Sequence, residues 1–150
     1  MILTDMKKSL FIICTLLCFA ASWAQKVTEK ELQGKWKLIS YTVTNATLDV
    51  ETGKVTVVNP NDTSASLKKD LEGFADDLKT AYIEIQGNNF YQIITDAVKN
   101  GPFTLDEKNG IQSINAAFDD GTNEQLPFIM KEGNLHFKLR HNKTYVYKKV

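Results

Sequence analysis

The stretch from 125 to 149, QLPFIMKEGNLHFKLRHNKTYVYKK, holds three short apolar segments separated by two tight turns, at 132–134 and 141–143. In its middle, LHFKLR (135–140) alternates apolar and polar side chains. Successive side chains of a strand point to opposite faces, so this alternation indicates a strand with one buried face. Tight turns between consecutive strands predict an antiparallel meander.

The same pattern extends toward the N-terminus. The first strand is expected at 34–44, and 47–58 reads as a weak hairpin or an ordered loop. Further short strands, separated by turns rich in glycine and asparagine, are predicted at 81–86, 90–95, 103–105 and 111–118. The expected fold is mainly β, an antiparallel up-and-down barrel of about eight to ten strands, because closure leaves no exposed edge. An open sheet curled over a helix is the competing fold.

One amphipathic helix is predicted at 64–80. Leu67, Leu71, Phe74 and Leu78 follow one another at spacings of four, three and four, which places them on one face of a helix. We expect this apolar stripe to cover either one mouth of the barrel or an open flank of the sheet.

Residues 1–24 have the layout of a secretory signal peptide. A basic start precedes the apolar run 10–21, and the small residues Ser22 and Ala24 precede a cleavage point before Gln25. The run is shorter than the roughly 20 residues of a membrane-spanning helix. The prediction is therefore export, one domain over 25–150, and no transmembrane segment in the mature chain.

Both cysteines, Cys14 and Cys18, lie within the predicted signal peptide. The mature chain would then be free of disulfides and thiolate ligands, which favours a bacterial periplasm or the extracellular space. A lipid anchor at Cys18 is disfavoured, because Leu17 is bulky where the processing enzyme needs a small residue.

Composition and motifs exclude several classes of function. Lysine plus arginine and aspartate plus glutamate each number 18, and the formal charge of zero gives no reason to expect nucleic acid as a partner. The two histidines, His136 and His141, have no second ligand at metal-site spacing, so neither a metal nor a cofactor is predicted. With no assembled catalytic motif, we expect a protein that is not an enzyme.

The two ends of the mature chain resemble a known superfamily. Gly34-Lys35-Trp36 is similar to the G-x-W signature that opens the first strand of calycins, which include lipocalins and fatty-acid-binding proteins. The ending 145–150, YVYKKV, resembles the last strand of the fatty-acid-binding proteins. In order and size, the whole mature chain is similar to secreted bacterial lipocalin-like domains.

The resemblance implies a role for Trp36 and a departure at Tyr145. In calycins this tryptophan closes the barrel floor, often beneath a basic side chain, for which Arg140, Lys148 and Lys149 are the candidates. Fatty-acid-binding proteins carry a carboxylate-binding arginine two residues before the final tyrosine, where this chain has Tyr145. We therefore expect a guest that is neutral or keeps its charged group at the barrel mouth.

Alternation assigns a set of side chains to the barrel interior, as the wall of a pocket or as a filled core. These candidates are Leu38, Ser40, Ile83, Ile85, Phe90, Gln92, Ile94, Phe103, Phe128, Phe137, Leu139, Tyr145 and Tyr147. The pocket leads to the main hypothesis, an exported binding protein for a small apolar or amphipathic, neutral ligand. A filled core leads to the alternative, a protein-binding module such as an inhibitor or an assembly accessory.

Overall fold

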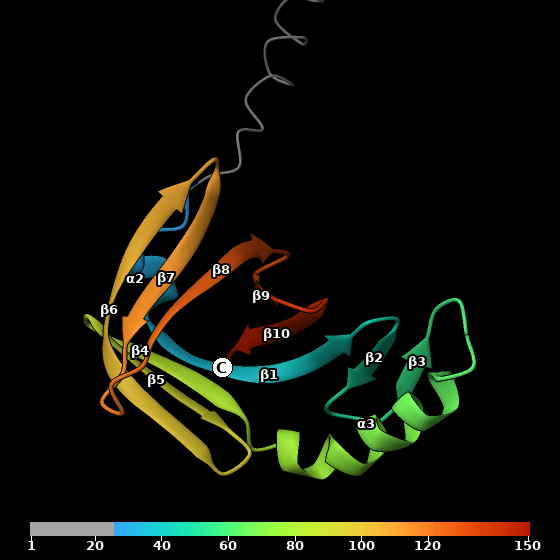
Figure 1. The fold of residues 1–150 in the computed structure, drawn as a ribbon. Helices are drawn as coiled ribbons and strands as arrows, with labels where there is room; N and C mark the ends of the chain where they lie inside the picture. Colours follow the sequence, from blue (N-terminus) through green and yellow to red (C-terminus); the bar gives the residue numbers. More distant parts are fainter. Residues whose placement is uncertain (1–25) are drawn as a thin grey trace, which may run out of the picture.

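The computed structural model describes residues 26–150, which form two helices and ten strands (Figure 1). The predicted signal peptide, residues 1–24 with Cys14 and Cys18, lies outside the described residues. In chain order the elements are α2 (Glu29–Leu32), β1 (Gly34–Val43), β2 (Ala46–Asp49), β3 (Val55–Val57), α3 (Ser64–Leu78), β4 (Tyr82–Gln86), β5 (Asn89–Ile94), β6 (Ala97–Lys108), β7 (Ile111–Ala117), β8 (Asn123–Lys131), β9 (Asn134–Leu139) and β10 (Lys143–Lys149).

Eight of the strands close into an antiparallel barrel. Consecutive strands pair from β4 to β10, and β1 then pairs with both β10 and β4. Trp36 marks the closure, because it lies opposite Lys149 on one side and Ile83 on the other. The predicted barrel is confirmed, and the open sheet is excluded because the last strand returns to the first.

The first strand has two successive partners along the edge opposite β10. Its first half pairs with β4 and its second half with β2, so the hairpin of β2 and β3 leaves the barrel as a side extension (Figure 1). Helix α3 packs along this hairpin and contacts both of its strands. The segment 47–58 is therefore a hairpin rather than a loop, and α3 covers a flank rather than a barrel mouth.

The buried face of α3 differs by one position from the predicted stripe. Leu71, Ala75 and Leu78 are buried, and Leu67 is partly buried. Phe74 is 53% exposed, so its assignment to the stripe was wrong. On a 3.6-residue period, positions 74 and 75 both lie close to the apolar stripe. The side chain buried against the hairpin is that of the small Ala75, and that of the large Phe74 is exposed.

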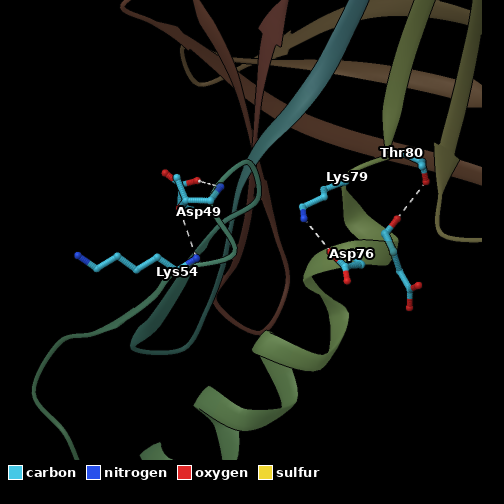
Figure 2. A network of polar contacts seen from close by, with 7 residues as sticks. Asp49, Lys54, Asp76, Lys79 and Thr80 are labelled. Carbon is cyan, nitrogen blue, oxygen red and sulfur yellow. Dashed lines mark hydrogen bonds and ion pairs between the residues drawn. The ribbon is translucent and has the colours of Figure 1, made fainter.

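The polar contacts near α3 are local ones. At the β2–β3 turn, the Asp49 carboxylate accepts a hydrogen bond from the Thr52 N–H at 2.8 Å. At the end of α3, the Lys79 Nζ lies 2.7 Å from the Asp76 carboxylate (Figure 2). These contacts stabilise each turn by itself, and the helix is joined to the hairpin by its apolar face and by a hydrogen bond from the Asn45 side chain to the Ser64 hydroxyl at 3.4 Å.

A bulge in β1 changes which side chains face inward. The pairing with β10 shifts register between Leu38 and Ser40. Beyond the bulge, Tyr41 lies opposite Tyr145, while Ser40 lies opposite the outward-facing Val146. A bulge adds one residue and reverses the alternation, so the interior assignment of Ser40 was wrong.

Strand β6 is longer than the predicted segment 103–105, since Gly101 and Pro102 lie within it. It pairs with β5 up to Pro102 and with β7 from Phe103 onward. A Cβ at Gly101 would lie 2.0 Å from the Ala117 carbonyl oxygen. The glycine is therefore needed for the close approach of two backbones where β6 changes partner, and it does not end the strand.

Within residues 26–150, neither helix has the length and apolar character needed to cross a lipid bilayer.

Candidate ligand cavity

One end of the barrel is closed by the segment that precedes β1. Helix α2 lies across this end, and its residue Leu32 is fully buried. Trp36 is only 2% exposed, and its indole Nε1 donates a hydrogen bond to the Leu32 carbonyl at 2.8 Å. The Lys149 Nζ lies 5.2 Å from the centre of the Trp36 ring. Trp36 thus lies at the floor of the barrel, and of the three basic candidates it is Lys149 that covers it.

Two glutamines hold the floor segment in place. The Gln112 side chain accepts a hydrogen bond from the Val27 N–H and donates one to the Val27 carbonyl, both at 2.8 Å. Gln33 makes the same paired contacts with the backbone of Gly87, at 2.7 and 2.9 Å. These contacts attach the chain before β1 to the β4–β5 turn and to the start of β7, and so seal this end.

The half of the barrel above this floor is filled by side chains. Six of the predicted interior residues are buried here, with aromatic contacts such as Phe90–Phe103 at 6.5 Å between ring centres. Close packing of this kind leaves no room for a guest. The six are Leu38, Ile83, Ile85, Phe90, Phe103 and Phe128.

The opposite half contains a cavity of about 180 Å³. Its wall comes from five strands and combines apolar side chains with a few polar ones, the usual composition of a binding pocket. Its lining residues are Gln92, Ile94, Ala97, Lys99, Glu124, Leu126, Phe137, Leu139, Tyr145 and Tyr147.

The deepest polar group of the cavity is the hydroxyl of Tyr147. This side chain is 1% exposed, and its Oη has no hydrogen-bond partner among the described residues. Burial raises the pKa of the Tyr147 phenol, and the neighbouring Gln92 side chain, which makes no hydrogen bond of normal geometry to it, lowers the pKa only in part, so the hydroxyl stays neutral. A buried hydroxyl without a partner costs about 1–3 kcal/mol, and a guest with an acceptor atom would remove that cost.

Tyr145 lies nearer the mouth and is held by another tyrosine. Its ring stacks on Tyr41 with 4.7 Å between the ring centres. Burial, together with the neighbouring Tyr41, raises the pKa of Tyr145 to about 12. Both tyrosines on this wall therefore present neutral hydroxyls at physiological pH.

An ion pair at the mouth completes the wall. The Lys99 ammonium contacts the Glu124 carboxylate, and the two side chains are 29% and 34% exposed. Lys99 also lies 5.1 Å from the centre of the Phe118 ring. The pair balances its own charge, so the inner cavity carries no net charge from these two residues.

The adjacent carboxylates Asp119 and Asp120 accept hydrogen bonds from nearby groups and do not line this cavity. The Asp120 carboxylate accepts a hydrogen bond from the Thr122 N–H at 2.8 Å, and Asp119 accepts one from the Asn100 side chain at 3.0 Å. The hydrogen bonds from the Thr122 side chain and backbone hold the pKa of Asp120 below its ordinary value.

The structure brings part of the predicted interior set together. Besides the six in the filled half, six candidates line the cavity: Gln92, Ile94, Phe137, Leu139, Tyr145 and Tyr147. Sequence reasoning missed Ala97, Lys99, Glu124 and Leu126. Leu126 and Glu124 share the alternation of Phe128 and were within reach. Ala97 and Lys99 were not, because they lie between the predicted strands 90–95 and 103–105, in the part of β6 to which no element was assigned.

Comparison with family models, with curated proteins and with solved structures finds no match for this chain.

Proposed function

We propose that this chain is an exported, non-enzymatic binding protein of the lipocalin-like kind. Its guest is a small apolar or amphipathic molecule held in the half of the barrel that contains Tyr147, away from the Trp36 floor. The observation that carries the proposal is the cavity of about 180 Å³ with the unpartnered Tyr147 hydroxyl in its wall. The G-x-W opening at Gly34-Lys35-Trp36 and the signal-like residues 1–24 support the lipocalin-like and exported parts.

The cavity volume sets the size of the guest. An engineered apolar cavity of about 150 Å³ holds benzene, and drug-sized pockets begin at about 300 Å³. The inner cavity therefore has room for a portion of the guest no larger than one ring or a chain of about six carbons. A whole long-chain lipid is too large for it.

The side chains of the cavity wall set the polarity of the portion of the guest that lies inside the cavity. Ile94, Leu126 and Phe137 give it an apolar surface, and Tyr147 offers one hydrogen-bond donor. A guest with one acceptor atom among apolar atoms satisfies this arrangement. Binding would then raise the free energy of unfolding through mass action.

The test is a titration of the protein with 1-hexanol, followed by backbone amide NMR and thermal unfolding. We expect shifts confined to amides around Gln92, Phe137 and Tyr147, and a rise in melting temperature. The variant Leu139→Trp places a large side chain in the cavity wall and should abolish both effects. Val98→Trp, at an exposed position of β6, is the matched control.

The protein-binding alternative predicts a different outcome. If hexanol gives no response in the parent protein or in Val98→Trp, and no small molecule co-purifies in native mass spectrometry, the cavity is not a binding site. The barrel would then act by its outer surface.

A further inference from the structure

The barrel wall is open between β8 and β9. Strands β8 and β9 pair only from Phe128 to Lys131 on the β8 side. The first part of β8, Asn123–Pro127, pairs with β7 but has no partner on β9 among the described residues, although β9 continues along β10 as far as Leu139. Pro127 stands at the first unpaired position and has no N–H for that edge.

This opening is a cleft of about 650 Å³. Leu126, Leu139 and Glu124 line both the cleft and the inner cavity. The two spaces therefore adjoin at these three side chains.

The cleft carries an excess of positive charge. Lys138, Arg140 and Lys143 line it, and among residues 26–150 none of the three forms an ion pair. Its one carboxylate, Glu124, is already paired with Lys99. Three unpaired cations around an opening attract an anion, and they do so without burying its charge.

We propose that the cleft between β8 and β9 binds the carboxylate of a short amphipathic anion whose mainly apolar part lies in the inner cavity, where an acceptor atom of that part takes the hydrogen bond of the Tyr147 hydroxyl. This proposal rests on the proposed function. It specifies in addition that the guest is negatively charged and that its head group lies in the cleft. It also explains why Tyr145 can stand where fatty-acid-binding proteins have an arginine. The head group lies outside the barrel wall, so the interior needs no cation.

The experiment compares hexanoate with 1-hexanol, which have the same chain length and differ in charge at neutral pH. Dissociation constants are measured by amide NMR on the purified protein at low and high salt. We expect hexanoate to bind about tenfold tighter than hexanol at low salt, with the preference reduced by salt because the cleft is solvated.

The test variant is the triple change Lys138→Gln, Arg140→Gln and Lys143→Gln, which should bring the two probes to within about twofold of each other. The matched control, Lys37→Gln, Lys69→Gln and Lys148→Gln, removes the same charge at exposed positions away from the cleft and should keep the preference. Tyr145→Phe should keep it as well. Thermal unfolding shows that each variant is folded.

The outcomes separate the two proposals. Equal binding of both probes by the parent protein overturns the anion cleft and leaves the cavity intact. A preference that survives the cleft variant, or is lost in Tyr145→Phe, overturns it too. Failure of both probes to bind overturns the proposed function itself.

Discussion

The two halves of the barrel share strands β5, β6 and β8 and differ in what fills them. Around Trp36 the interior is packed with aromatic and aliphatic side chains, and α2 closes the end. Around Tyr147 the interior has a cavity of about 180 Å³, and the wall between β8 and β9 is open. Close packing favours stability, so we expect the filled half to contribute more to the free energy of unfolding than the half with the cavity.

The largest expected effect tests the filled half. Trp36→Ala should lower the free energy of unfolding by about 3–5 kcal/mol, because it leaves a cavity in a closely packed region and removes the bond to Leu32. Urea unfolding followed by circular dichroism measures this. Trp36→Phe, which keeps most of the ring, serves as control. A loss below about 1 kcal/mol would mean that the floor is not a packing centre.

The next effect has the opposite sign and tests the cavity half. Tyr147→Phe removes a buried hydroxyl that has no partner, so it should raise the free energy of unfolding by about 1–2 kcal/mol. The same change should weaken 1-hexanol binding about fivefold. Destabilisation by Tyr147→Phe would contradict the picture, because it would mean that the hydroxyl is already satisfied.

Tyr145, in the wall of the cavity, should make the free energy of unfolding depend on pH. The pKa of Tyr145 is raised from 10.0 to about 12, so between these values the unfolded chain loses the proton before the folded one does. The contribution of Tyr145 is fully present below pH 10 and is lost as the pH rises toward 12. Urea unfolding at about pH 9 and about pH 11 should show a fall that is smaller in Tyr145→Phe. An equal fall in the free energy of unfolding in the parent protein and in Tyr145→Phe would contradict a contribution from Tyr145.

The smallest effect is expected at the mouth. Lys99 and Glu124 are both about one-third exposed, so Lys99→Gln should change the free energy of unfolding by less than about 1 kcal/mol. A double-mutant cycle with Glu124→Gln measures the coupling between the two. A coupling well above that value would make the ion pair a structural element of the cavity half.

The candidate site was predictable where alternation is regular. The pattern LHFKLR at 135–140 assigned Phe137 and Leu139 inward, and the structure places both in the cavity wall. Ser40 was misassigned because the bulge after Leu38 has no local signature. Lys99 was missed because Gly101-Pro102 has the composition of a turn, although here it lies within a strand.

The sequence alone determined most of the strands, most of their inward faces and the existence of helix α3, while helix α2 and the first part of β6 were not predicted. These follow from periods of two and of about 3.6 residues, which are properties of neighbouring positions. Tertiary structure alone decided that β10 closes on β1 and that α3 buries Ala75 in place of Phe74. It alone decided that Tyr147 is left without a partner and that β8 separates from β9. Each of these depends on contacts between residues far apart in the chain, and no local pattern encodes which distant backbone or side chain will fill, or fail to fill, the space.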